Sequence, residues 1–229
     1  MRVLMLILMS EGHPYDSFRT IWRTYMKSHP GIDCYFYCAK PNLFTDYQLD
    51  DDTLWIRLPE NHGTLFEKTI RAFRYFVNMR PNTYSFVFRP NASALVNLPK
   101  YYEMCTTFPT TGFCSAPILR RGEVIEHPVV EAPSGCGYTL SFDLVKRFAR
   151  EPNLRNVVID DISIGYYLQE WKIPIVSAVV YPFEYREYSP EELGGILASN
   201  FHFRFRTTDD RRWDIQTMKL VADTIYGKK

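Results

Sequence analysis

The feature that most constrains the fold is an unbroken apolar run near the start of the chain. Residues Val3–Met9 contain no polar side chain, and the chain-breaking residues Gly12, His13 and Pro14 follow soon after. A strand without polar alternation is typical of the centre of a parallel sheet that is covered on both faces. The run is too short to span a membrane and no small-residue cleavage site follows it, so we interpret it as a buried strand, not a signal sequence.

Strand-like and helix-like segments alternate along the rest of the chain. The predicted strands cover residues 34–39, 53–58, 85–89, 157–161, 173–181 and 201–206, with short strands at 113–119 and 124–130. The predicted helices cover residues 15–27, 65–79, 141–150, 162–171 and 214–226, and a further helix starts at Ser189-Pro190. This order predicts an α/β fold with a mixed, mainly parallel sheet flanked by helices. We expect residues 105–133 to form a hairpin-rich insertion that carries a substrate face, not part of the main core.

No repeat, low-complexity tract or flexible linker divides the 229 residues, which predicts one domain over 1–229. The 27 Lys and Arg nearly balance the 26 Asp and Glu, which excludes bulk electrostatic binding of nucleic acid or anionic lipid. No CxxC pair is present among the five cysteines, so neither a disulfide framework nor a zinc site is indicated. A reducing, cytoplasmic location follows. The aromatic share of 16% reflects either a bulky core or exposed rings for flat ligands such as bases or sugars.

Two adjacent carboxylates, Asp160 and Asp161, follow an apolar run and precede a predicted helix. Either residue can simply cap that helix, because backbone N–H groups and the helix dipole favour negative charge there. Alternatively, one carboxylate projects into a cleft and removes a proton from an attacking hydroxyl.

Two other segments are candidates for binding an anionic ligand. Gly135-Cys136-Gly137 is predicted to be a loop before a helix, where glycine permits close approach of the backbone to a ligand; a plain turn is the alternative. Lys68 and Arg71 lie three residues apart on one face of a predicted helix. They can meet a diphosphate or form an ordinary solvated basic surface.

The acidic run Asp50-Asp51-Asp52 precedes a predicted strand, whereas ligands in open α/β sheets bind beyond the carboxyl ends of strands. We therefore interpret this run as a solvated turn, not a metal site. The carboxyl end of the predicted strand 85–89, with the residues that follow it, is a better candidate and carries Arg89, Asn91 and Ser93. An amide and a hydroxyl are weaker metal ligands than carboxylates.

The late strand 201–206 alternates between two kinds of side chain. His202, Arg204 and Arg206 are predicted to share one face, with phenylalanines on the other. Imidazole and guanidinium groups in a row suit phosphate oxygens or a metal–diphosphate complex, although an ordinary amphipathic edge strand has the same pattern.

Taken in order, five segments resemble one enzyme family. They are Met9–Gly12 with Tyr15, Phe18, Arg19 and Trp22; Lys68–Phe73; Phe88–Ser93; Gly135–Ser141; and Asp160–Gly165. Together they resemble the GT-A glycosyltransferases related to fringe and the β-1,3-galactosyltransferases. The most similar of these are the compact enzymes of large algal (chlorovirus-type) DNA viruses.

The resemblance implies a GT-A (Rossmann-like) fold and transfer of galactose, xylose, glucose or a similar sugar from a UDP-sugar donor to a glycan acceptor. Residues 1–104 would mainly bind the nucleotide-sugar, and residues 105–229 would mainly bind the acceptor and catalyse transfer. Fringe-like enzymes invert at the anomeric carbon, which makes Asp161 the general base and Asp160 its neighbour or alternative.

The resemblance also assigns binding roles. Ser10, Glu11 and Arg19 would lie near the nucleoside and Lys68 near the phosphates. The segment from Gly135 to Tyr138 would line the pocket for the donor sugar and acceptor. Apart from the resemblance, the high aromatic share makes the rings near this expected acceptor face candidates for sugar stacking: Tyr101, Tyr102, Phe108 and Tyr138. Manganese or magnesium would sit on the diphosphate, with His202, Asn91 and Ser93 as its candidate ligands.

The chain departs from the family where fringe carries an Asp-x-Asp motif, because Arg89-Pro90-Asn91-Ala92-Ser93 stands there. Metal affinity should then be lower or metal use absent, with Arg89 taking over part of the charge neutralisation. This departure leaves open a catalytically inactive or sugar-binding module of the same fold. Two further alternatives do not depend on it: a retaining transferase with the same fold, and a different nucleotide-binding α/β enzyme.

Overall fold

The computed structural model describes residues 1–121, 130–154, 156, 159–207 and 211–227. Its main sheet has eight strands in the order β11 (Ile175–Ser177), β7 (Cys114–Ala116), β10 (Gly137–Ser141), β5 (Phe86–Pro90), β1 (Val3–Leu8), β2 (Ile32–Ala39), β4 (Thr53–Ile56) and β3 (Tyr47–Asp50). Strands β5, β1, β2 and β4 are mutually parallel, whereas β10 runs antiparallel to β5. The predicted mixed, mainly parallel sheet is confirmed.

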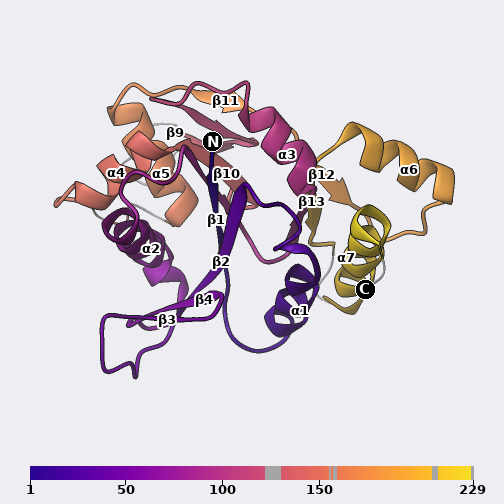
Figure 1. The fold of residues 1–229 in the computed structure, drawn as a ribbon, viewed down its shortest axis with the longest axis horizontal. Helices are drawn as coiled ribbons and strands as arrows, with labels where there is room; N and C mark the ends of the chain where they lie inside the picture. Colours follow the sequence, from indigo (N-terminus) through magenta and orange to yellow (C-terminus); the bar gives the residue numbers. More distant parts are fainter. Residues whose placement is uncertain (122–129, 155, 157–158, 208–210, 228–229) are drawn as a thin grey trace.

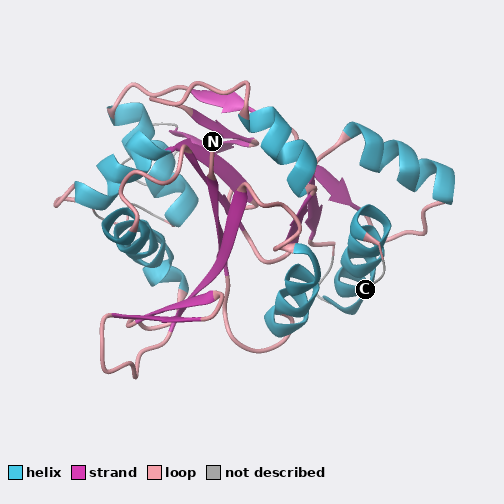
Figure 2. Ribbon diagram, viewed as in Figure 1, coloured by secondary structure: helices cyan, strands magenta, loops and turns pink. Residues whose placement is uncertain are grey.

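Helices cover both faces of this sheet (Figures 1 and 2). One face carries α2 (Leu65–Met79), α4 (Phe142–Arg150) and α5 (Asp160–Glu170), and the other carries α1 (Tyr15–Tyr25), α3 (Leu98–Cys105) and α7 (Arg211–Tyr226). Successive residues of β1 alternate between the two cores, with Met5 facing α1 and Leu6 facing α2. All β1 residues are buried except Leu8, which is partly exposed, so the first strand is central as its sequence predicts.

A second, three-stranded sheet has the order β12 (Tyr181–Phe183), β13 (His202–Phe205) and β6 (Ala94–Val96), and helix α6 (Pro190–Ser199) lies beside it. Strand β6 starts four residues after β5 ends, so this small sheet grows directly out of the carboxyl edge of the main sheet. The predicted start of α6 is confirmed, because the Ser189 side chain accepts a hydrogen bond from the backbone N–H of Glu192 at 3.1 Å.

Several expected elements are different in the structure. The segment from Gly137 to Ser141 is not a loop but the buried strand β10, which pairs with β5 and β7. Residues 113–119 divide into β7 and β8 (Ile118–Arg121), and β7 belongs to the main sheet, so this part of the expected insertion is core. β8 pairs with β9 (Val130–Pro133), while most of the expected strand 124–130 lies outside the described residues. The apolar run before Asp160 also lies partly outside them, and α5 begins at Asp160 itself.

The acidic run forms the turn of the hairpin between β3 and β4, where Asp51 has a φ of 47°. It is not fully solvated, because Asp52 is buried and both of its carboxylate oxygens accept hydrogen bonds from Arg23 at 2.8 Å. This pair neutralises the carboxylate at the end of the sheet opposite the carboxyl edge.

All five cysteines are buried and unpaired. Burial raises the pKa of each thiol, because the thiolate loses its hydration. No helix among the described residues is long and apolar enough to cross a bilayer.

Candidate functional site

A cleft of about 500 Å³ opens at the carboxyl edge of the parallel strands. The segments that follow β1, β4 and β5 contribute lining residues, as do the start of α5 and the small sheet. Its lining consists of Leu8, Met9, Ser10, Tyr15, Glu60, Asn61, His62, Leu65, Arg89, Asn91, Ser93, Gly135, Asp160, Asp161, Arg204, Arg206 and Arg211. The fold thus brings together both predicted catalytic carboxylates and six of the predicted binding residues: Ser10, Arg89, Asn91, Ser93, Gly135 and Arg204.

Arg89 lies at the centre of the polar network in this cleft. Its guanidinium donates to the Tyr37 hydroxyl at 2.9 Å, to Asn91 Oδ1 at 2.9 Å and to the Gly135 carbonyl at 2.8 Å. It also forms an ion pair with Asp160. Only 1% of Arg89 is exposed, so its charge depends on these partners for solvation.

Asp161 differs from its neighbour because no cation is paired with it among the described residues. Its carboxylate accepts hydrogen bonds from the backbone N–H groups of Gly135 at 3.2 Å and Ile162 at 2.9 Å. Burial raises the pKa of Asp161, and the negative charge of Asp160 raises it further, while Arg89 opposes the shift. A carboxylate with a raised pKa at a cleft wall is suited to accept a proton.

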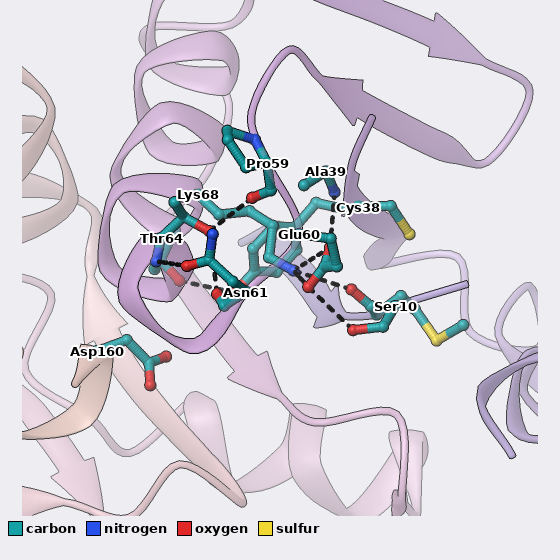
Figure 3. A network of polar contacts seen from close by, with 12 residues as sticks. Ser10, Cys38, Ala39, Pro59, Glu60, Asn61, Thr64, Lys68 and Asp160 are labelled. Atoms are coloured by element: carbon teal, nitrogen blue, oxygen red, sulfur yellow. Dashed lines mark hydrogen bonds and ion pairs between the residues drawn. The ribbon is translucent and has the colours of Figure 1, made fainter. Parts of the chain in front are cut away.

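A second network surrounds Glu60, to which the sequence prediction assigns no role (Figure 3). The Lys68 ammonium contacts both carboxylate oxygens, at 2.7 and 2.9 Å, and also the Met9 carbonyl at 3.1 Å. Ser10 donates to the same carboxylate at 3.1 Å, and the Ala39 N–H donates at 3.2 Å. Glu60 therefore ties together the ends of β1 and β2. Glu60 was predictable by the same rule as Asn91: ligand-binding residues follow the carboxyl ends of parallel strands, and Glu60 closely follows the parallel strand β4.

Six predicted binding residues do not line the cleft. Lys68 is fully buried beneath Glu60, and Arg71 lies on the outer surface of α2, paired with Glu67 at 2.6 Å. Arg19 packs over the rings of Phe36 and Trp55. Among the described cleft residues neither Glu11 nor Cys136 appears.

Gly137, also outside the cleft lining, packs so closely that a Cβ would stand 2.7 Å from Phe88 and 2.8 Å from His202. The rings expected to stack on a sugar are also elsewhere. Tyr101 and Tyr138 are fully buried, and Phe108 packs against Phe86 and Phe113. Tyr15, which is 38% exposed, lines the cleft instead.

The predicted metal ligands fit a divalent cation poorly. Asn91 and Ser93 line the cleft, but Asn91 Oδ1 already accepts a hydrogen bond from the cationic Arg89. His202 is 1% exposed and packs edge-on against Phe88; its Nε2 has no hydrogen-bond partner, and it does not line the cleft. Burial lowers the pKa of His202 to about 4. Within the described ranges no group of three or more His, Cys, Asp or Glu is arranged to hold a metal.

Comparison of the fold with solved structures gives a match over nearly the whole chain. A glycosyltransferase involved in the glycosylation of the major capsid of PBCV-1 aligns with a TM-score of 0.55 at 9% sequence identity, covering 96% of this chain and 100% of that one. The chain has the GT-A fold. No protein-family model matches the sequence, and no curated protein matches it either.

Proposed function

We propose that the protein is an inverting, fringe-like glycosyltransferase that moves a sugar from a UDP-sugar to a hydroxyl of a glycan acceptor. The observation that carries the proposal is the position of Asp161. Its carboxylate lines the cleft at the carboxyl edge of a GT-A fold, unpaired with any cation among the described residues and with a raised pKa.

In the proposed reaction Asp161 accepts the proton of the acceptor hydroxyl. The hydroxyl oxygen then forms a bond to the anomeric carbon, while the bond from that carbon to the β-phosphate oxygen breaks. The electron pair leaves with UDP, and attack from the opposite face inverts the anomeric configuration. Asp160 is a poorer candidate for the base, because Arg89 already neutralises its charge.

The remaining cleft residues have roles that their positions support. Ser10 follows the end of β1 and Tyr15 begins α1, and both line the part of the cleft where the nucleoside of the donor would bind. Gly135 holds the base by its N–H group and lies where the donor sugar would sit. Within this proposal the enzyme acts in the cytoplasm, where five unpaired thiols stay reduced.

The test is UDP release from a panel of UDP-galactose, UDP-xylose and UDP-glucose, with an NMR assignment of the product anomer. Thermal shift identifies the donor first, because a bound donor stabilises the fold by mass action. We expect Asp161→Asn to lower transfer by about 10²–10⁴-fold while UDP still binds. Asp50→Asn, at an exposed aspartate of the β3 hairpin, is the matched control.

No release from any donor would favour the inactive or sugar-binding module. A product with retained configuration would identify a retaining transferase. Either result overturns the proposal.

A further inference from the structure

The charges around the cleft separate into paired and unpaired groups. Lys68 is paired with Glu60, Arg89 with Asp160, and Arg211 with Asp214 at 2.8 Å. In contrast, Arg204 and Arg206 have neither a hydrogen bond nor an ion pair within the described part of the chain. Two guanidinium groups therefore remain available to a ligand in the cleft.

These two arginines lie beside the segment that carries acidic residues in the resembled family. In the small sheet, Arg204 is directly opposite Ala94, and the Phe205 N–H donates to the Ser93 carbonyl at 3.0 Å. The strand alternation places Arg204 and Arg206 on the same side, and both line the cleft with Ser93 and Asn91. The expected sign of charge at this position is thus reversed, from carboxylates that would bind a cation to cations that would bind an anion.

We propose that Arg204 and Arg206 bind the diphosphate of the donor directly, without a divalent cation. The inference rests on the proposed function and concerns the same cleft. A guanidinium donates two parallel hydrogen bonds to phosphate oxygens and stays charged at every working pH. As the anomeric carbon–oxygen bond breaks, the two fixed positive charges stabilise the electron pair that moves onto the β-phosphate.

Arg89 reinforces this arrangement. It is the first residue of the segment Arg89–Ser93, and its guanidinium donates to Asn91 Oδ1. A metal bound by that oxygen would stand next to a fixed positive charge, which opposes its binding. The guanidinium of Arg89 donates to protein groups, so Arg89 acts by positioning Asn91 and Asp160. In the proposed complex Arg204 and Arg206 contact the ligand.

Isothermal titration calorimetry with UDP, UMP and uridine tests the proposal, in EDTA and in MnCl₂. We expect the affinity for UDP to be the same in both buffers. Arg206→Ala and Arg204→Ala should each weaken UDP binding by about tenfold, since each removes charge-assisted hydrogen bonds, while uridine binding is unchanged. Arg204→Lys keeps the charge without the paired donors and should recover only part of the loss. Arg150→Ala, at an exposed arginine at the end of α4, is the control.

Each outcome decides the proposal. A tenfold or greater gain in UDP affinity with MnCl₂, or wild-type UDP binding by both alanine variants, overturns it. Arg206 is exposed, so loss of folding does not complicate its variant. Transfer that requires manganese would refute this inference and leave the proposed function standing. Metal-free UDP binding through the arginines, without transfer from any donor, would support this inference and refute the proposed function.

Discussion

The Lys68 ammonium lies 2.7 and 2.9 Å from the two carboxylate oxygens of Glu60, and the two partners differ sharply in exposure. The Lys68 side chain is fully buried, whereas 32% of the Glu60 side chain is exposed. Removing either partner leaves one unpaired charge, but only the ammonium would be left without water.

We therefore expect Glu60→Gln to destabilise the fold more than Lys68→Met. Glu60→Gln should cost about 3–5 kcal/mol, the usual penalty for an uncompensated buried charge. Lys68→Met leaves a carboxylate that still has Ser10, the Ala39 N–H and some water as partners. Urea unfolding of both variants measures the difference, and equal losses would contradict the argument.

Two glycines, Gly135 in the cleft lining and Gly137 outside it, should respond differently to alanine. A Cβ at Gly137 would stand 2.7 Å from Phe88 and 2.8 Å from His202, both buried. Overpacking of this kind costs about 1–3 kcal/mol, so Gly137→Ala should lower the melting temperature. A Cβ at Gly135 would stand 3.2 Å from Asp161 Oδ2.

Gly135→Ala should therefore displace Asp161, the proposed base, by a few tenths of an ångström and lower the transfer rate with little loss of stability. Thermal melts and initial rates on both variants test this contrast. A Gly135→Ala enzyme with wild-type turnover would show that the position of Asp161 tolerates the shift.

The pKa of Asp161 makes a prediction about stability against pH. Because its pKa is raised on folding, the native state binds the proton more tightly than the unfolded chain, and stability falls as pH rises through the window above the ordinary aspartate value of 3.8. Asp161→Asn removes this penalty. The variant should be more stable than wild type at neutral pH, and the difference should vanish below pH 3.8. Chemical denaturation across pH checks both the sign and the window.

The buried pair of Arg89 and Asp160 should behave as one unit. Arg89→Met leaves Asp160 as an uncompensated carboxylate next to Asp161, and Asp160→Asn leaves a buried guanidinium without its counter-charge. Each single variant should lose several kcal/mol, about 3–5 by analogy with other buried pairs.

The double variant should lose less than the sum of the two, because it buries no unpaired charge. A double-mutant cycle by urea unfolding measures the coupling. The pH dependence of transfer gives a second readout: without Arg89, the acidic limb of the Asp161 profile should move to higher pH, since the opposing cation is gone. Additive losses of unfolding free energy, together with an unchanged acidic limb of the pH–rate profile, would show that Arg89 and Asp160 are not coupled.

The central elements were predictable because their sequence patterns are strong. Val3–Met9 has a single reading as a buried strand, and the expected bounds of the helix Leu65–Met79 agree with α2. The short strands β3 and β6 and the helix α3 were not predicted, since their stability comes from pairing and packing, not from a local pattern. The segment that starts at Gly137 was expected to be a loop, since glycine usually disrupts strands. In the structure it is a strand, and a glycine is required at position 137 because Phe88 and His202 leave no room for a Cβ.

The parts of the candidate site that lie at the ends of strands were predictable from the sequence. Asn91, Ser93 and the pair Asp160-Asp161 converge because their segments end or begin at one edge of the sheet. The direction of a long side chain is not encoded in helical spacing: Lys68 and Arg71 share a face by periodicity, yet one turns inward to Glu60 and the other outward to Glu67. Lys68 is held by a tertiary partner, Glu60, whereas Arg71 is paired with Glu67 on its own helix.

The burial of all five cysteines makes this chain a convenient background for site-specific labels. Thiol reagents attack the exposed thiolate, and every native thiol is both covered and held in its protonated form. One cysteine introduced at Phe44, a fully exposed residue near the β3 hairpin, would therefore carry a fluorophore or spin label alone. Distances between such a label and a bound nucleotide could then be followed in solution without first removing any native cysteine.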